Sequence, residues 1–407
     1  MMKRSLLRER DFSLLAGSVG VSALGDWLAG IVLILQIQSM TDSGLAVSAL
    51  LICLWAPVVV LAGHVGLLVD RIETTRLLVV VSLLQAGIAA ALGFVGSVPA
   101  ILALAAVLGV GFALSQAAEF ALVPAVAGTD RVREANGHIE TARYIGFTIG
   151  PLCGGLLAAA GGTRVGMLVN AASFLVVAGA ALAMRARRVP LTVADGDAKP
   201  RIRDGVVQLF TDRVLGLGMT IAFVSLLFMS ASIPADVFFV KSVLGVGDVG
   251  YSLVFTFWTV GMIFGALRLS RLVPKTSLVV VAFAGVAVQG LGKALPPIFL
   301  IFGLMLVCYM IGGVGHGLKN VMFRTLIHER VPEEMHGRAF AAYNGVRNGA
   351  ELGALALGGF LIAVIGARTT LLVAGGVSAA AGVFGIALLP RIRAREAVAL
   401  ERAAAGA

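Results

Sequence analysis

The sequence predicts an all-α membrane protein in which twelve transmembrane helices form two pseudo-symmetric six-helix bundles. Three observations lead to this prediction: the composition, the length of the apolar runs, and a repeat that relates the two halves of the chain. Of the 407 residues, 59% are hydrophobic and only 13% are charged, whereas a soluble domain is about 25% charged. A globule of this size cannot bury so many apolar side chains, so we expect lipid to surround much of the chain.

Twelve apolar runs are long enough to cross a bilayer as helices, because about 20 helical residues span the roughly 30 Å hydrocarbon core. The runs cover residues 12–38, 44–66, 75–96, 99–123, 137–160, 165–186, 214–239, 250–272, 277–295, 298–322, 339–365 and 369–389. Strands of a membrane barrel would be about ten residues long with alternating polarity, so these runs predict helices.

The basic residues predict the orientation of these helices. With a cytoplasmic N-terminus, 25 of the 32 Lys and Arg residues fall inside, and only Arg164, Lys241, Lys293 and Arg368 fall outside. This positive-inside bias predicts that both termini are cytoplasmic in the plasma membrane. The net charge of +10 is therefore expected to meet anionic lipid at the cytoplasmic face, and no nucleic-acid partner is expected. The first apolar run is too long for a signal-peptide core, so we expect a retained first helix.

A single long polar stretch within the chain divides six predicted helices from six. It reads RARRVPLTVADGDAKPRIRDGVVQLFTDR over residues 185–213. We therefore expect an N-terminal bundle at 1–186, a cytoplasmic linker at 187–213, and a C-terminal bundle with a cytoplasmic tail at 214–407. Residues 203–213 predict a short amphipathic helix. Its apolar side chains, expected to face lipid or protein, are Val206, Val207, Leu209 and Phe210.

The two halves resemble each other when the sequence is shifted by 204 residues. Residues 109–184 then align with 313–388 without a gap and share 16 identities over 76 positions. The matches include Arg143 with Arg347 and Arg164 with Arg368. Parallel repeats of this kind are an architecture of secondary transporters, which hold substrate near the middle of the membrane.

Four short motifs resemble those of a known family. GLLVDR at 66–71 resembles the G-x-L-x-D-R signature of the major facilitator superfamily, which lies in the cytoplasmic link between helices 2 and 3. GFTIGPLCGG at 146–155 resembles the G-P-x-x-G-G motif of exporters in that superfamily. VPEEMHGR at 331–338 and SALGDW at 22–27 are similar to motifs of its drug and siderophore efflux branch, the drug:proton antiporters. The resemblance covers nearly the whole chain and implies the major facilitator fold.

The resemblance also implies a gate on the cytoplasmic side. Asp70 would accept hydrogen bonds at the N-terminus of helix 11, where the helix dipole favours an anion. That contact would latch the halves while the cavity faces outward. The residues of this gating motif are Gly66, Asp70, Arg71, Arg76, Gly337 and Arg338. The alternative is that these charges only keep a short loop at the membrane surface. The chain departs from the family pattern after Arg71, where IETTR leaves one basic residue and adds Glu73.

Charged residues within apolar runs are candidates for proton coupling or for recognition of a cation, because a charge at membrane depth is costly and usually functional. Asp26 lies near the middle of the first predicted helix, where a carboxylate can bind and release protons. The alternative for Asp26 is a structural hydrogen bond to a neighbouring helix. The other candidates are Glu119, Glu140, Arg143, Arg347 and Glu351. Local pairing of Glu140 with Arg143 and of Arg347 with Glu351, at helical spacing, is the alternative to a proton relay; Arg143 also has Glu119 as a candidate partner.

Two further sets of residues are candidates on weaker sequence patterns. Small residues in helix 5 predict close helix packing and a bend at the proline; they are Gly146, Gly150, Pro151, Gly154 and Gly155. Aromatic and Met residues of helices 7 and 8 predict either helix packing or a cavity for apolar ligands. The cavity candidates are Phe223, Phe228, Met229, Phe255, Trp258 and Met262.

We expect a secondary active transporter, and not an enzyme, that exports small amphipathic molecules in multidrug efflux, driven by proton antiport. The chain has no phosphate-binding G-x-x-x-x-G-K-[ST] loop and no metal or catalytic constellation, so no cofactor and no metal are expected. The expected partners are the small-molecule substrate, protons and anionic lipids, with the protein as a monomer. The alternatives are a dedicated exporter of one endogenous metabolite, such as a siderophore, and a membrane receptor or scaffold that does not transport.

Overall fold

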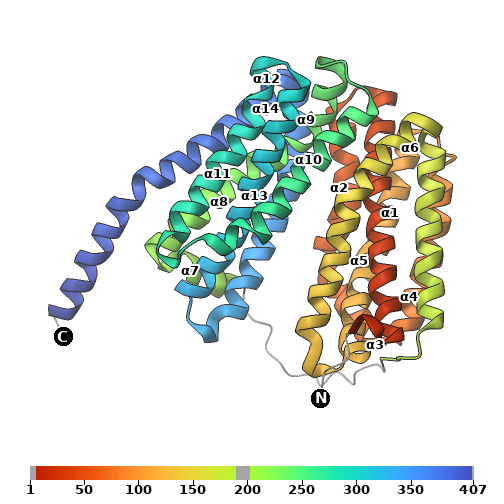
Figure 1. Ribbon diagram of the computed structural model, residues 1–407, viewed down its shortest axis with the longest axis horizontal. Helices are drawn as coiled ribbons and strands as arrows, with labels where there is room; N and C mark the ends of the chain where they lie inside the picture. Colours follow the sequence, from red (N-terminus) through yellow and green to blue (C-terminus); the bar gives the residue numbers. More distant parts are fainter. Residues whose placement is uncertain (1–5, 189–201, 406–407) are drawn as a thin grey trace. The chain divides into compact units, whose positions relative to one another are not determined.

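The computed structural model describes residues 6–188 and 202–405, and every regular element in these residues is helical (Figure 1). The basic tail residues Lys3 and Arg4 and the middle of the predicted linker, 189–201, lie outside the described residues. The chain divides into two compact units. Unit 1 contains Met1–Asp197 and Val246–Thr256, and unit 2 contains Ala198–Gly245 and Phe257–Ala407.

Unit 1 is a bundle in which α1 packs mainly against α6, and α4 packs against α5 and α6. Its helices, in chain order, are η1 (Leu6–Arg8), α1 (Arg10–Thr41), α2 (Gly44–Val60), α3 (Ala62–Arg71), α4 (Thr74–Leu92), α5 (Val98–Ala127), η2 (Thr129–Arg131) and α6 (Val132–Ala183). Ser43 begins α2 as its N-cap, since its hydroxyl accepts a hydrogen bond from the backbone N–H of Ala46. Buried apolar side chains such as Phe12, Leu15 and Leu122 form a core near one end of the bundle.

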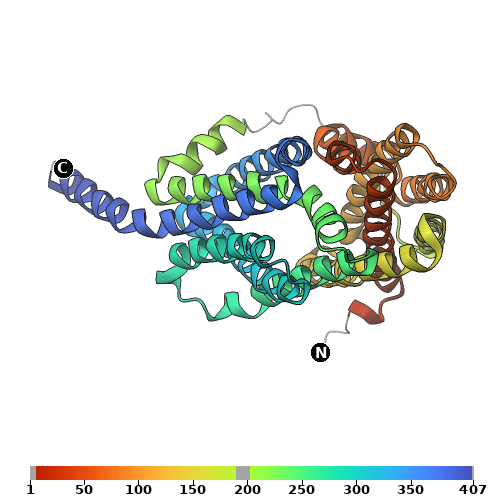
Figure 2. The same cartoon turned by 90° about the horizontal axis from the view of Figure 1, so that it is seen from above.

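Unit 2 is a second bundle, in which α11 packs against α13 and α14, and α14 packs against α8. Its elements are α7 (Ile202–Thr211), α8 (Arg213–Ala231), α9 (Ile233–Phe238), the π-turn η3 (Phe239–Val243), η4 (Leu269–Leu272), η5 (Lys275–Ser277), α11 (Leu278–Ala294), α12 (Pro296–Phe299), α13 (Phe302–Arg330), η6 (Glu333–Met335) and α14 (His336–Ala405). The helix α10 (Asp248–Leu267) begins in unit 1 and ends in unit 2. The last part of α14 runs beyond the packed helices to the C-terminus (Figures 1 and 2).

Twelve membrane spans are present in the described residues. Nine helical segments are long and apolar enough to cross a membrane, and α2 with α3 forms a tenth candidate bent by 58°. Two of the nine, Glu134–Ala183 and Arg338–Ile392, have 50 and 55 residues. A helix of that length is about 75 Å long or more, over twice the thickness of a bilayer core. Each of these segments is interrupted by a glycine with non-helical backbone, so each provides two spans and the total is twelve.

The two interruptions are Gly162 in α6 and Gly366 in α14, and they lie 204 residues apart. Both have positive φ, 67° and 76°, with extended ψ. This region of backbone space is essentially restricted to glycine. An arginine follows two residues later in each unit: Arg164 stacks over the ring of Phe94 at 4.3 Å, and Arg368 Nε donates to the carbonyl oxygen of Pro297 at 2.9 Å. The local turn between the last two spans is therefore repeated in both units.

Packing between helices is repeated at the same interval. A Cβ placed on Gly109 of α5 would lie 2.6 Å from the carbonyl oxygen of Leu54 in α2. A Cβ placed on Gly313 of α13 would collide with the carbonyl oxygen of Trp258 in α10. Both members of the first pair lie 204 residues before their counterparts, so the close approach of these helices belongs to the repeat.

The short helix expected in the linker is α7, and it is amphipathic. Leu209 is 1% exposed and joins the core of unit 2, with Val206 packed against that core. Val207 and Phe210 are 58% and 47% exposed, on the opposite side. One face of α7 therefore packs on the bundle, while the other has exposed apolar side chains suited to a membrane surface.

The prediction that Lys293 lies in an outside loop is wrong. Lys293 belongs to the last turn of α11 and is 4% exposed. Hydropathy placed it at the end of an apolar run, but its side chain turns inward to a partner that only the folded unit provides.

Candidate functional site

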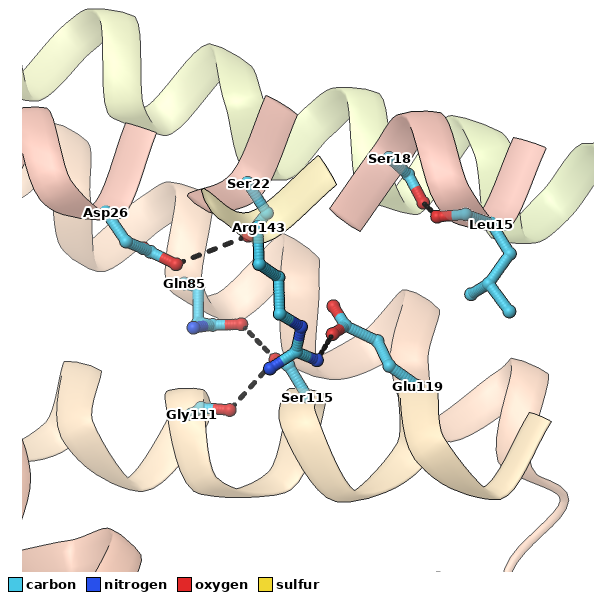
Figure 3. Close-up of polar contacts among 9 residues, drawn as sticks. All are labelled: Leu15, Ser18, Ser22, Asp26, Gln85, Gly111, Ser115, Glu119 and Arg143. Carbon is cyan, nitrogen blue, oxygen red and sulfur yellow. Dashed lines mark hydrogen bonds and ion pairs between the residues drawn. The ribbon is translucent and has the colours of Figure 1, made fainter. Parts of the chain in front are cut away.

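A buried ion pair joins two helices of unit 1. Arg143 of α6 donates from Nη2 to Glu119 Oε2 of α5 over 2.8 Å (Figure 3). Glu119 is 6% exposed. The guanidinium group also lies 4.7 Å from the ring centre of Phe120, the residue after Glu119. These contacts hold Arg143 against α5, away from lipid.

Asp26 of α1 extends the pair into a cluster with two carboxylates and one cation. Glu119 and Arg143 both act electrostatically on Asp26. Asp26 Oδ2 accepts a hydrogen bond from the hydroxyl of Ser22 at 3.4 Å, one turn earlier (Figure 3). No ion pair to Asp26 occurs among the described residues. The positive charge of Arg143 therefore compensates only one of the two negative charges of this cluster, which lies at membrane depth.

Gln85 of α4 was not expected from the sequence and lies in the same part of unit 1. The hydroxyl of Ser115 donates to Gln85 Oε1 over 2.6 Å (Figure 3). Gln85 Nε2 and Arg143 Nε are both buried without a hydrogen-bond partner among the described residues. The counterpart of Gln85 at the repeat interval is Gln289, which is also fully buried. A glutamine at matched positions of two apolar runs is the signal that could have identified both.

An aromatic cluster in unit 1 includes Trp27, the residue that follows Asp26 in α1. The Trp27 ring lies 4.2 Å from Phe147 and 5.9 Å from Trp55, between ring centres, and Trp55 lies 5.6 Å from Phe112. These four residues come from α1, α6, α2 and α5 of unit 1. The tertiary structure thus gathers aromatic rings from four helices, which no local pattern indicated.

The link between α3 and α4 has its own network. Asp70, at the end of α3, accepts a hydrogen bond at Oδ1 from Arg188 Nη2 over 2.7 Å. Glu73, which departs from the family pattern, is the N-cap of α4 and accepts from the backbone N–H groups of Thr75 and Arg76. Glu73 therefore stabilises the start of a helix.

Other members of the predicted gating motif make fewer contacts. A Cβ at Gly66 would meet nothing within 4 Å, so no helix among the described residues packs closely against this glycine. Arg71, Arg76 and Arg338 are exposed. A contact of Asp70 with the region of Gly337 and Arg338 would join the two units, and it stays a prediction.

The small residues of α6 form a stripe against α1. A Cβ at Gly146 would lie 2.6 Å from the backbone nitrogen of Leu24, and one at Gly150 would lie 2.7 Å from its carbonyl oxygen. Gly154 faces the carbonyl oxygen of Leu28 in the same way. Gly155, on another side of α6, lies against Ser252. The stripe allows backbone contact between α1 and α6, with Pro151 buried between its second and third members.

The other predicted ion pairs have different outcomes. Arg347 and Glu351, four residues apart on α14, lie 3.6 Å apart between Nη2 and Oε2. The expected pair of Glu140 with Arg143 does not occur among the described residues, because the arginine turns to Glu119 on the neighbouring helix.

Unit 2 also contains a buried charged network that the sequence did not indicate. Lys293 Nζ of α11 donates to Asp236 Oδ2 of α9 over 2.5 Å, and the Tyr309 hydroxyl of α13 donates to Asp236 Oδ1 at the same distance. Lys293 also lies 5.6 Å from the ring of Trp258. The charge of Asp236 is therefore neutralised by Lys293, and both of its carboxylate oxygens accept a hydrogen bond.

Of the six aromatic and Met candidates, one belongs to unit 1 and five belong to unit 2, and a shared cavity stays a prediction. Phe223 lies 6.2 Å from Tyr343, between ring centres, and packs on the core of unit 2. Trp258 lies 5.8 Å from Tyr309. Phe255 belongs to unit 1, where its ring lies 5.6 Å from Trp27. Met229 is 7% exposed, and Phe228 and Met262 are half-buried.

Comparison with solved structures shows the same fold in several transporters. The nucleoside transporter NupG, in a mutant form, matches with a TM-score of 0.73 and 14% identity, over 95% of this chain and 100% of that chain. A bacterial homologue of the iron transporter ferroportin, in an inward-facing state, matches with a TM-score of 0.68 and 15% identity, over 96% and 99%. The peptide transporter POT, as a mutant in complex with sulfate, matches with a TM-score of 0.65 and 16% identity, over 94% and 95%.

No curated protein sequence matches the chain. The sequence profile described as Major Facilitator Superfamily matches residues 15–354, which is most of the 407 residues. The fold, the twelve spans and this match lead to one conclusion. The chain is a multi-pass integral membrane protein that belongs to the Major Facilitator Superfamily, a class of transporters.

Proposed function

We propose that this transporter exports small amphipathic molecules across the plasma membrane by alternating access, in exchange for protons. In this proposal both termini are cytoplasmic, the protein works as a monomer, and anionic lipids contact its cytoplasmic face. The drug and siderophore efflux branch is the proposed place of the chain within its superfamily, with multidrug resistance as a consequence of broad substrate choice.

The observation that carries proton coupling is the cluster of Asp26, Glu119 and Arg143. Arg143 compensates Glu119 directly, at 2.8 Å, whereas the hydrogen-bond partner of Asp26 among the described residues is the Ser22 hydroxyl. Uptake of one proton by the two carboxylates would make the cluster neutral. A change of one charge at membrane depth is worth several kcal/mol, which is enough to favour one conformation of a two-state transporter over the other.

The aromatic cluster supports an amphipathic substrate. Trp27, Trp55, Phe112 and Phe147 form a cluster of aromatic rings in unit 1, and aromatic side chains bind varied apolar groups. The resemblance of the α6 glycine and proline motif to that of exporters supports the outward direction.

Reconstituted vesicles provide the test. Purified protein is reconstituted in liposomes with its cytoplasmic face outward, and the interior of the liposomes is made acidic. Uptake is then measured for three probes: ethidium, 1-naphthaleneacetate and 1-naphthaleneacetamide. We expect the wild-type protein to concentrate at least one probe inside the liposomes while protons leave the acidic interior. Asp26→Asn and Glu119→Gln are expected to lose accumulation. The matched control is Glu134→Gln, which removes an exposed carboxylate of α6 and should behave as wild type.

The outcome separates the proposed function from its alternatives. If Asp26→Asn concentrates the probe as well as wild type does, the cluster does not couple protons to transport. Uptake that requires the opposite gradient would indicate import. A dedicated exporter would transport one chemical class only, and the absence of flux for every probe would favour a receptor or scaffold.

A further inference from the structure

Unit 2 contains a buried lysine that forms no ion pair with any residue whose side chain the structure describes. Lys319 lies on α13, within a candidate membrane span, and is 4% exposed. Among the described residues, none forms a hydrogen bond or an ion pair with its ammonium group. A buried cation without compensation costs several kcal/mol, so its presence at membrane depth indicates a function.

The charges around Lys319 leave a positive excess. Arg347 and Glu351, both on α14, act electrostatically on Lys319. Glu351 is already paired with Arg347 at 3.6 Å, so one carboxylate faces two cations. Lys293 does not alter this balance, because it is neutralised by Asp236.

Lys319 shares α13 with His316, which contacts one polar and one aromatic side chain. His316, one turn before Lys319, has its Nδ1 atom 3.0 Å from Gln289 Oε1. The imidazole ring of His316 lies 5.6 Å from the ring of Trp258, between ring centres. At the base of the lysine, a Cβ on Gly285 of α11 would lie 3.1 Å from Lys319 Cβ. The glycine therefore gives the lysine stem room between α11 and α13.

The repeat shows how the two units differ. Arg143 of unit 1 corresponds to Arg347 of unit 2, at an interval of 204 residues. Glu119, which neutralises Arg143, corresponds to Phe323. Ser115, a neutral residue, corresponds to Lys319. At these two positions unit 2 has an apolar residue in place of a carboxylate and a cation in place of a serine. Its cluster of two cations with Glu351 is therefore suited to an anion, whereas that of unit 1 is suited to a proton.

We propose that Lys319 and Arg347 bind a carboxylate of the transported molecule, and that the substrates of this protein are amphipathic acids. The proposal rests on the proposed transport function and names its substrate class. The carboxylate supplies the missing negative charge to the two cations. The apolar body of the substrate lies against aromatic side chains such as Trp258.

Equilibrium binding to the purified protein in detergent is the test, because binding needs no proton gradient. The probes are 1-naphthaleneacetate and 1-naphthaleneacetamide, which have nearly the same size and differ by one charge. We expect wild type to bind the acetate more tightly than the amide. Lys319→Gln should weaken acetate binding by about 30-fold, as expected for loss of one partner of a buried charge pair, and leave amide binding unchanged. Lys319→Arg should restore most of the preference.

The matched control is Arg271→Gln, which removes an exposed cation of unit 2 and should bind both probes as wild type does. Equal binding of acetate and amide by wild type would overturn the proposal, even if Lys319→Gln failed to fold. So would an unchanged acetate affinity in a folded Lys319→Gln protein. If the acetate preference depends on Lys319 but vesicles show no proton-driven uptake, the proposed coupling fails while the anion site stands.

Discussion

Arg188 Nη2 lies 2.7 Å from Asp70 Oδ1 and joins the segment after α6 to the C-terminal end of α3. The same guanidinium donates from Nη1 to the carbonyl oxygen of Val69 at 3.3 Å. The signature carboxylate of the link therefore has a partner in its own unit, at the point where the chain enters the linker.

We expect Asp70→Asn to reduce transport strongly and Arg188→Gln to reduce it less, because only the first variant also removes the anion available to the predicted latch near Gly337. The pair is partly exposed, so each change should alter the free energy of unfolding by less than about 1 kcal/mol. Vesicle uptake normalised to inserted protein is the measurement, with Arg185→Gln, an exposed neighbour, as control. Normal uptake by Asp70→Asn would disprove the latch.

The contact of α6 with α1 should depend on Gly150. A methyl group there would lie 2.7 Å from the carbonyl oxygen of Leu24, so Gly150→Ala should destabilise unit 1 by about 1–3 kcal/mol. Gly179→Ala is the control on the same helix, because a Cβ at Gly179 meets nothing within 4 Å and alanine favours helix. Thermal unfolding in detergent measures both; the same loss for the two variants would contradict this packing.

Substitution of either glycine that divides two spans should destabilise the protein because of backbone strain, and not because of steric crowding. A Cβ at Gly162 or Gly366 meets nothing within 4 Å, yet both residues have positive φ. Gly162→Ala and Gly366→Ala should each cost about 1–3 kcal/mol of folding free energy. Gly376→Ala, at an open and regular position of α14, should cost nothing. Unchanged thermal stability of both strained variants would show that the turn tolerates other backbone conformations.

The Glu119–Arg143 pair should show strong coupling between its partners. Arg143→Gln leaves a buried carboxylate unpaired, and we expect a loss of about 3–5 kcal/mol. The double variant Glu119→Gln with Arg143→Gln should regain much of that stability, since no isolated charge remains, but should not regain proton-driven uptake. Denaturation of the single and double variants gives the interaction energy, and strictly additive losses would show that the two side chains are energetically independent.

The sequence by itself determined the membrane class, the positions of the spans and the repeat. These properties depend on local quantities, namely the length of an apolar run and the spacing of matched residues such as Arg143 and Arg347. Lipid selects long apolar helices wherever they occur in the chain, so no tertiary information is needed. The glycines of α6 were recognisable for the same reason, because small residues at helical spacing indicate close packing whatever the neighbour is.

Only the tertiary structure decided which charges meet. Arg143 had Glu140 within reach on its own helix and instead contacts Glu119 on α5, Asp70 contacts Arg188, and Lys293 turns inward to Asp236. Each outcome depends on the rotation of one helix against another, which side-chain packing sets and a linear sequence does not contain. The lack of an ion pair for Lys319 among the described residues follows from the same cause, since it can be seen only when the neighbours on every packed helix are known.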